Sequence, residues 1–511
     1  MKLVEALRRD VGASVVVVFS TIFLVASLWL TWNGGPLPPD ALEYSEVARN
    51  LVRGAGYTLN LVEIHAGMLP GIRHLHELHG LLEPFLLAPL FALFGPESRL
   101  VRIPGLVFVA ALAFATFLLG KRVSGSAAGC VAGLLVLARR DLSFGATLGG
   151  DDIGWAFFST VAVFAFLVAL SSRTTRWFVL AGAAAAFATL EKVTGAALPA
   201  CFFATALLMR PRARLGVRAW SLLTLPAIFV LGVYALRNHA IHGGFGFRYS
   251  PLDWLSKDSP PAYFAFYEQA PKLADVFARL GSSRVLSLVR EQFALLARAA
   301  ADDALFLVGG PVALLWLARK RTAFASFGIV YVTAVTLVVC VAYHVEPRYL
   351  FALYPVYFVA LATVALEVTN GSEGRARLAF ASFGVVFVYY LVAVLRMERQ
   401  IGVAGATKGA CEPAMEFIRK TAGVNEPVLT SSPWFVTWAT ERPSVNVPTN
   451  GPAAVARVAR HYGAKWAVDG MPTFGGADVR AALRAVNGKR GLRADRVFAD
   501  AVCSVYRLNG D

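Results

Sequence analysis

Apolar residues occupy long uninterrupted stretches of the chain, and short polar or basic connectors separate them. A helix needs about 20 residues to cross the hydrocarbon core of a bilayer, and most of these stretches approach that length. We predict about eleven transmembrane helices: Val11–Trp32, Arg102–Gly120, Ser126–Phe144, Ile153–Leu170, Trp177–Leu190, Ala196–Met209, Ala219–Leu236, Ala304–Leu317, Phe324–Tyr343, Tyr349–Leu366 and Leu378–Leu395. The expected fold class is a polytopic α-helical membrane protein.

The positions of the basic residues predict the orientation in the membrane. Lys and Arg gather in connectors such as Lys121-Arg122 and Arg319-Lys320-Arg321, which are expected on the cytoplasmic side. Lys2 and Arg8-Arg9 place the N-terminus there too, and an odd number of spans then places the C-terminal tail outside. The first stretch has no small-residue cleavage site behind it, so we predict an uncleaved span.

Those acidic residues near the span ends that look buried all fall on the outer side of this topology, although they played no part in setting it. These residues are Asp40, Asp151, Asp152, Glu191 and Glu346. Their common side predicts that a functional site lies at the outer rim of the membrane.

Composition agrees with a membrane protein and excludes one class of partner. The chain has 511 residues, of which 57% are hydrophobic and 16% are charged, whereas soluble domains carry about 25% charged residues. The formal net charge of +16 would suit a nucleic-acid-binding protein. We expect no nucleic-acid partner, because the Lys and Arg residues lie in the connectors between apolar stretches.

The chain divides into a predicted membrane domain, residues 1–398, and a tail, residues 399–511. Large outer loops are expected at 33–101 and 237–303 within the first part. The tail alternates short expected helices (Pro413–Thr421, Ala453–Tyr462, Asp478–Val486) with expected strands (Pro427–Thr430, Lys465–Val468, Val497–Leu508), and Pro433–Thr440 is expected to be irregular. This alternation predicts a small extracytoplasmic α/β domain. In it, Cys411 and Cys503 either form a disulfide or remain two unpaired thiols.

The stretch Pro38–Tyr57 predicts a short helix just outside the first span. Asp40, followed by Glu43 three residues later, has the pattern of an N-cap and capping box. Gly54 and Gly56 predict the end of the helix. A second short apolar stretch, His79–Phe94, suits an interfacial helix better than a span.

Together these features resemble the GT-C superfamily of polyprenyl-phosphate-sugar-dependent membrane glycosyltransferases, nearest to the protein O-mannosyltransferase and lipid A aminoarabinose transferase group. The matching residues are Asp40, Tyr44, Ala48 and Leu51 with Gly54–Tyr57; Glu83-Pro84 through Phe94-Gly95; Arg102-Ile103-Pro104; Asp152 with Ala156–Phe158; and Arg348-Tyr349 before Pro355. Ala41 stands where the family often has Glu, and Glu83-Pro84 is a reduced form of the family's K/H-P-P-L.

The resemblance implies a sugar donor on a polyprenyl phosphate and inversion at the anomeric carbon. The acceptor would be a glycolipid, a polysaccharide or a protein, at the outer face of a bacterial-type inner membrane. Two other hypotheses stay open: a transporter or flippase of lipid-linked sugars without transferase activity, and a non-catalytic scaffold whose tail binds a partner. Transporters, however, place functional charges near the bilayer midplane.

An acceptor hydroxyl must lose its proton as it attacks the anomeric carbon, so the site needs a carboxylate. We predict Asp40 as this base, with Glu43 as the second candidate, although Asp40 also has a purely structural interpretation as the helix cap. Asp152 matches the family's second acidic loop. With Asp151 it could bind a divalent cation or orient the acceptor; alternatively both are solvated loop acids.

The lipid phosphate leaving group requires cations. The candidates on the outer side are Arg348, Lys192, Arg139 and Arg140. Arg348 could instead pair only with Glu346, and Arg139 and Arg140 could anchor a span end. Tyr44 and Glu83 join the predicted substrate-binding residues because they lie in the family motifs.

A histidine cluster and an aromatic segment complete the candidates. His74, His76 and His79, with His65 and Glu77 nearby, could hold zinc, or they belong to a flexible polar loop. The aromatics of Gly243–Tyr267 could close over the site as a lid or form an interfacial belt.

Overall fold

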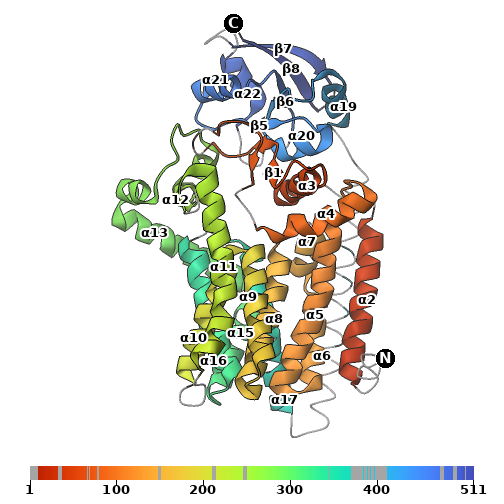
Figure 1. Ribbon diagram of the computed structural model, residues 1–511, viewed down its shortest axis with the longest axis vertical. Coiled ribbons are helices and arrows are strands. Elements are labelled where there is room, and N and C mark those ends of the chain that lie inside the picture. The colour runs from red at the N-terminus through yellow and green to blue at the C-terminus, as the bar shows by residue number, and fades with distance from the viewer. Residues whose placement is uncertain are drawn as a thin grey trace.

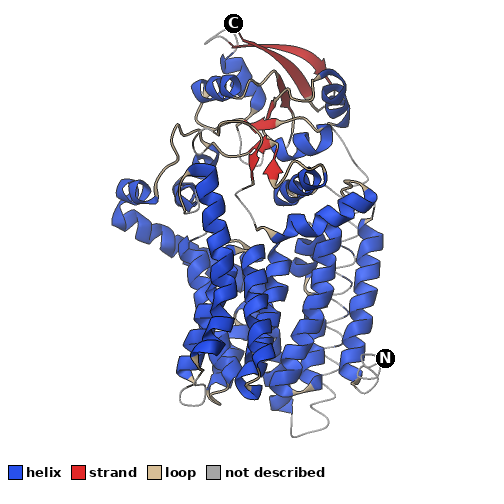
Figure 2. Ribbon diagram, viewed as in Figure 1, coloured by secondary structure: helices blue, strands red, loops and turns tan. Residues whose placement is uncertain are grey.

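The computed structural model describes residues 10–32, 37–209, 215–245, 250–342, 345–369 and 411–510. Short gaps lie at 66, 68, 77–79, 148–150, 472–476, 487–491 and 501, and between 370 and 410 only four single positions are described. The predicted span Leu378–Leu395 and the boundary near residue 398 fall outside the described residues. The described residues form a bundle of long helices with a smaller layer of strands and short helices at one end (Figures 1 and 2).

The bundle follows the predicted apolar stretches closely. Its helices are α2 (Val11–Thr31), α5 (Arg102–Ser124), α6 (Ser126–Ala138), α8 (Asp151–Ser172), α9 (Thr175–Glu191), α10 (Ala197–Leu208), α11 (Val217–His242), α14 (Ala304–Leu307), α15 (Gly309–Ala318), α16 (Ala323–Leu337) and α17 (Tyr354–Thr369). In the described part of the chain, six helices are long and apolar enough to cross a membrane, or seven if one bent pair counts as a span. A polytopic helical membrane fold is confirmed, and the count of eleven spans stays a prediction.

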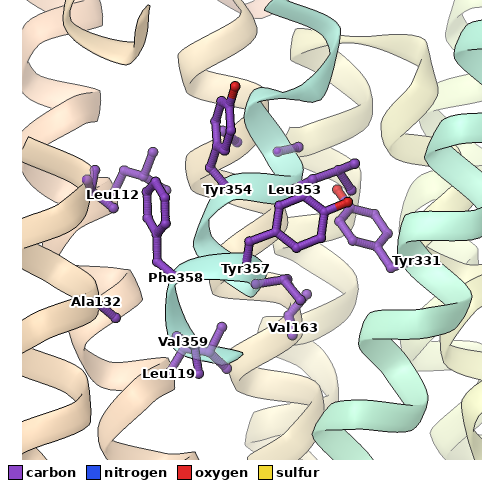
Figure 3. Packing of buried hydrophobic residues seen from close by; sticks show 14 of the residues in the cluster. Leu112, Leu119, Ala132, Val163, Tyr331, Leu353, Tyr354, Tyr357, Phe358 and Val359 are labelled. Atoms are coloured by element: carbon purple, nitrogen blue, oxygen red, sulfur yellow. The ribbon is translucent and has the colours of Figure 1, made fainter. Parts of the chain in front are cut away.

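The bundle core lies around α17. From α17, Phe358 lies beside Leu112 of α5, and Tyr357 lies near Val163 of α8 and Tyr331 of α16 (Figure 3). Small residues let neighbouring helices approach closely, as at Gly129, where an added Cβ would lie 2.4 Å from the carbonyl oxygen of Phe117. The core is thus closed by aromatic side chains and by direct backbone contact.

An outer layer covers one end of the bundle. It contains α3 (Pro39–Val52), β1 (Thr58–Leu59), β2 (Leu61–Val62), β3 (His74–Leu75), α4 (Leu82–Phe94), α7 (Arg140–Thr147), α12 (Ser250–Asp258) and α13 (Leu273–Asp302). The short helix around Asp40 and the short helix ending at Phe94 were both predicted. Gly54 and Gly56, with φ of 74° and 79°, follow the end of α3 as expected.

The predicted capping box is wrong. The N-cap of α3 is Pro38, and no side chain caps it. Pro39 occupies the first helical position, where its missing N–H is tolerated and its fixed φ suits a helix. The helix therefore begins two residues earlier than expected, with its N-cap at Pro38 instead of Asp40, and Asp40 lies inside the first turn.

The outermost part is a six-stranded sheet with the order β2-β5-β4-β6-β8-β7. Its C-terminal elements are α19 (Glu412–Thr421), β4 (Val428–Thr430), α20 (Pro433–Thr440), β5 (Ser444–Asn446), α21 (Pro452–His461), β6 (Trp466–Asp469), α22 (Val479–Val486), β7 (Leu492–Ala499) and β8 (Ser504–Gly510). The α/β prediction is confirmed, and Cys411 and Cys503 form a disulfide with their Cα atoms 5.4 Å apart.

Two details of this layer differ from the prediction. Pro433–Thr440 forms helix α20 instead of an irregular segment, since Pro433 lies in the first turn and the bulky side chains that follow bury one face. The sheet is also not made by the tail alone. Strand β2, from the first outer loop, pairs in parallel with β5 through Leu61 and Val62.

Candidate active site

Asp40 and Arg348 meet where the outer layer rests on the bundle. Asp40 lies in the first turn of α3, and Arg348 lies in the 3₁₀ turn η4 (Pro347–Leu353) that leads into α17. Nη1 of Arg348 donates to Oδ2 of Asp40 at 2.5 Å. These residues are 308 positions apart in the chain. Both remain partly open to solvent, with 38% of the Arg348 side chain and 23% of the Asp40 side chain exposed.

Arg348 also faces two further carboxylates. Its Nε donates to Oε2 of Glu346 at 2.5 Å and lies 3.8 Å from Oδ2 of Asp152. The guanidinium thus stands among three acids. The ion pair with Glu346 is present, and the role of Arg348 as a phosphate-binding cation stays a prediction. Arginine suits this position because its planar fork can address several oxygens at once.

Lys192 and Asp152 form the second ion pair of the site. Asp152 lies in the first turn of α8, and Lys192 directly follows the end of α9. Nζ of Lys192 donates to Oδ1 of Asp152. The ammonium also lies 4.3 Å from the ring centroid of Tyr349, the residue after Arg348. Asp40, Arg348, Asp152 and Lys192 therefore form one continuous group from α3, η4, α8 and α9.

Behind this group lie acids and a tyrosine that are almost fully buried. Asp151, Glu83 and Glu191 are 4%, 1% and 0% exposed, and Tyr44 is fully buried. Burial, and then the negative charge of Asp151, raises the pKa of both Tyr44 and Glu83 well above the usual values. The predicted substrate-binding residues Tyr44, Glu83 and Asp151 thus lie together, one layer inside the open pair of Asp40 and Arg348.

Glu191 is a member of this buried layer that the predicted set of site residues omitted. It ends α9, one residue before Lys192. Gly154 of α8 leaves room for it, because a Cβ at Gly154 would lie 2.4 Å from Oε1 of Glu191. The signal was available in the sequence: Glu191 is an acid at the outer end of a predicted span, beside a predicted site cation.

Arg139 lies in a separate cluster. It forms ion pairs with Asp141 and with Asp303 at 2.6 Å, and its Nη2 donates to the hydroxyl of Tyr354 at 2.9 Å. Its guanidinium also stacks over Phe306. These contacts join the end of α6 to the bend between α13 and α14, and they match the interpretation of Arg139 as an anchor. Arg140 is exposed at the start of α7.

Glu43 points away from Asp40, into the interface with the C-terminal sheet. Its Oε2 lies 3.2 Å from Nε2 of His76, and its Oε1 accepts a 2.7 Å hydrogen bond from Nε1 of Trp434. Both partners are buried. A small pocket lies beside Glu43, lined by Glu63, His74 and aliphatic side chains.

The predicted histidine metal site is not assembled in the described part of the chain. His74 lies within hydrogen-bonding distance of two backbone carbonyls, those of Leu75 and Leu61, one at each ring nitrogen. His76 instead faces Glu43. No three His, Cys, Asp or Glu side chains are grouped there as metal ligands; His79 and Glu77 lie outside the described residues. A divalent cation at Asp151 and Asp152 stays a prediction.

Part of the aromatic outer segment packs on the rest of the outer layer. The backbone of Tyr267 exchanges hydrogen bonds with His65 and Gly67 of the first outer loop, at 2.8 and 3.0 Å. The side chain of Asn450 bonds both the N–H and the carbonyl of Phe266, at 2.9 and 2.8 Å. The described aromatics here therefore join the two outer loops to the C-terminal sheet.

Comparisons with known proteins agree with this architecture. The family model for dolichyl-phosphate-mannose-protein mannosyltransferases matches residues 78–235. The crystal structure of ArnT from Cupriavidus metallidurans bound to undecaprenyl phosphate superposes with a TM-score of 0.59 at 14% identity, covering 96% of this chain and 97% of that one. The chain has the GT-C glycosyltransferase fold.

A second solved GT-C protein matches over a smaller part of its length. The archaeal oligosaccharyltransferase AglB from Archaeoglobus fulgidus, in complex with an inhibitory peptide and a dolichol-phosphate, gives a TM-score of 0.57 at 13% identity, covering 90% of this chain and 69% of that one. The A. fulgidus oligosaccharyltransferase in complex with Zn and sulfate gives 0.57 at 14% identity, covering 88% and 67%. No curated protein matches the sequence at a significant level.

The family match and the GT-C fold together confirm the predicted class, a multi-pass membrane glycosyltransferase. The roles of individual residues, the donor and the acceptor are argued below from the geometry of this chain.

Proposed function

We propose that this chain transfers a sugar from a polyprenyl phosphate to an acceptor hydroxyl, with inversion at the anomeric carbon, and that Asp40 is the general base. The observation that carries the proposal is the pairing of Asp40 with Arg348, beside Asp152 and Lys192, at the solvent-accessible rim of the bundle. Two carboxylates and two cations from four different elements converge there. This is the set of charges that such a transfer requires.

In the proposed reaction, a carboxylate oxygen of Asp40 accepts the proton of the acceptor hydroxyl. The hydroxyl oxygen forms a bond to the anomeric carbon, while the bond from that carbon to the phosphate oxygen breaks and its electron pair stays on the phosphate. Arg348 and Lys192 stabilise the negative charge that develops there, as preorganised cations do. Asp152 holds Lys192 in place through their ion pair.

Donor binding would also prepare the base. Without donor, Arg348 is shared among Asp40, Glu346 and Asp152. A donor phosphate competes for the same N–H groups, because arginine binds phosphate and carboxylate oxygens in the same bidentate manner. Arg348 then leaves Asp40 free to accept a proton only when the donor is present. ArnT and AglB have been solved with undecaprenyl phosphate and dolichol-phosphate, which supports this class of donor.

We place the site at the outer face of a bacterial-type inner membrane, with the N-terminus in the cytoplasm and the C-terminal sheet outside. The basic connectors of the sequence support this orientation. The acceptor class follows the resemblance: a glycolipid, a polysaccharide or a protein.

The test is transfer by the full-length protein in liposomes that contain radiolabelled polyprenyl-phosphate sugars, comparing wild type with Asp40→Asn. Removing a general base typically lowers the rate by 10² to 10⁴-fold. We expect a loss in this range, with binding of undecaprenyl phosphate retained. Asp141→Asn is the matched control, because Asp141 is an exposed acid whose ion-pair partner is Arg139. It should transfer at the wild-type rate.

The same liposomes distinguish the alternative hypothesis. Equal transfer by wild type and Asp40→Asn would remove Asp40 as the base. Movement of the lipid-linked sugar between leaflets, without transfer by the wild-type protein, would replace the transferase with a flippase. The gathering of the charged residues at one end of the bundle favours the transferase.

A further inference from the structure

The helix that carries Asp40 is enclosed by protein along most of its length. Ten consecutive residues of α3, from Ala41 to Asn50, are buried, including Glu43, Glu46 and Arg49. A helix buried on all sides cannot satisfy such side chains with water, so each needs a partner in the surrounding protein. The identity of these partners shows what holds the helix in place.

Many of the partners belong to the C-terminal region, nearly 400 residues further along the chain. Trp434 of α20 donates its indole N–H to Glu43. At the other end of α20, Nη2 of Arg49 donates to the carbonyl of Thr437 at 3.1 Å and Nη1 to that of Trp438 at 3.4 Å. The last carbonyls of a helix have no partner within it, and a cation there also meets the negative end of the helix dipole. Helix α20 therefore contacts α3 at two points.

The first outer loop completes the enclosure. Asn60 donates from Nδ2 to Glu46 at 2.7 Å and to Oδ1 of Asn50 at 3.1 Å, while Asn50 donates to the carbonyl of Thr58 at 2.8 Å. The loop then continues into β2, the edge strand of the C-terminal sheet. The sheet thus reaches α3 by two routes, directly through α20 and indirectly through Asn60.

We propose that the C-terminal sheet is a positioning element of the active site, and that Trp434, acting through Glu43, holds α3 at the place where Asp40 meets Arg348. Glu43 lies one turn after Asp40 on the same helix, so a shift or tilt of α3 at Glu43 also moves the carboxylate of Asp40. On this inference Glu43 is a positioning residue and not a second base. The inference deepens the proposed function and rests on it for the role of Asp40.

Hydrogen exchange of the full-length protein in detergent tests, without any substrate, whether Trp434 holds α3 in place. Trp434→Phe keeps an aromatic ring but removes the N–H donor, together with part of the buried indole. We expect the α3 peptide, residues 39–52, to exchange at least tenfold faster in this variant, while α5 and α8 keep their wild-type exchange.

The chain offers a matched control for this substitution. Trp466 of β6, in the same sheet and also buried, donates its indole N–H to Glu426 at the same distance, 2.7 Å, and no described contact joins it to α3. Trp466→Phe should leave the exchange of residues 39–52 unchanged. If both variants loosen α3 equally, or if neither does, the positioning role of Trp434 is overturned.

Kinetics of sugar transfer test the functional part. Trp434→Phe should lower kcat at least tenfold and change KM for the polyprenyl-phosphate sugar less than threefold, since Arg348 and Lys192 lie on other elements. Glu43→Gln keeps one oxygen to accept from Trp434, loses the charge and replaces the oxygen that faces His76 with an NH2 group, so it should transfer within threefold of wild type. A loss with Glu43→Gln as large as that with Asp40→Asn would make Glu43 a base and overturn its assignment as a positioning residue.

The two proposals fail separately. If the wild-type protein transfers no sugar, the proposed function fails, and the exchange of residues 39–52 still decides whether the sheet holds α3.

Discussion

Each charged residue of the site has its role set by the partners it meets. Arg348 faces Asp40, Glu346 and Asp152, whereas Arg139 is enclosed by Asp141, Asp303 and Tyr354. Both are arginines at the outer end of a bundle helix, and both are plausible phosphate ligands by sequence. The first is open to a ligand and the second is occupied by contacts between helices, so substitutions at the two positions should have different effects.

Arg348→Gln should reduce sugar transfer at least 100-fold and weaken the binding of undecaprenyl phosphate, because it removes the cation shared by the site acids. Loss of charge stabilisation at one such contact typically costs 10² to 10³ in rate. Titration of detergent-solubilised protein with undecaprenyl phosphate measures the binding. Unchanged affinity would place the phosphate elsewhere.

Arg139→Ala should instead destabilise the fold, by about 3 kcal/mol, because it leaves Asp303 without its cation partner at the bend after α13. Thermal unfolding of the purified protein measures this, with Arg140→Ala as the exposed control. If Arg139→Ala lost undecaprenyl-phosphate binding at an unchanged unfolding temperature, Arg139 would belong to the donor site.

The sequence predicts individual residues of this site but does not predict which of them are in contact. Asp40, Asp152, Lys192 and Arg348 were found because each is a charge at the end of an apolar stretch on one predicted side. That Arg348 contacts Asp40 depends on how helices pack, which no local pattern records. The capping box was mistaken because the start of α3 lies two residues earlier, at Pro39, and only the positions of Trp434 and His76 show where Glu43 points.

At the scale of elements, the length of an apolar stretch decides how well its helix can be predicted from the sequence. The bundle helices were predicted well because their apolar stretches approach the length of a membrane span, which is longer than the apolar runs of a loop. Strands β2 and β5 were missed because two or three residues carry no measurable alternation. They form by pairing with neighbouring strands, β2 with β5 and β5 also with β4. Helix α20 was missed because it has few strong helix formers and is stabilised by burial.

Two glycines offer a test of how α9 packs against α11. Gly182→Ala in α9 should destabilise the bundle by about 1–3 kcal/mol, because its Cβ would lie 1.9 Å from the carbonyl oxygen of Leu222 in α11. Gly232→Ala, within α11 itself, meets nothing within 4 Å. It should be neutral or stabilise by up to about 1 kcal/mol through helix propensity. Thermal unfolding of both variants in the same detergent gives the comparison, and equal shifts would contradict the packing of α9 on α11.

At the scale of the whole molecule, the outer layer combines residues from both ends of the chain. The Cys411–Cys503 disulfide closes a segment of 92 residues that contains β4, β5, β6 and β7 but not β8. Cross-links over segments of this length typically stabilise by about 2–4 kcal/mol, largely by restricting the unfolded chain.

Reduction of this disulfide should therefore lower the unfolding temperature of the outer layer while the bundle helices keep theirs. Differential scanning fluorimetry with and without reductant measures the change, and Cys411→Ser with Cys503→Ser should reproduce it without reductant. An unfolding temperature that is indifferent to both treatments would show that the bond contributes nothing to the outer layer.

The pairing of β2 with β5 also has a consequence for how the protein is made. Ribosomes add about 5–20 residues per second, so Leu61 leaves the ribosome tens of seconds before its neighbour Ser444 exists. During that interval the spans are inserted one after another, but α3 lacks both α20 and the strand that anchors its loop. A nascent chain would thus reach the membrane as an inert precursor, and it would become competent only when translation is nearly complete.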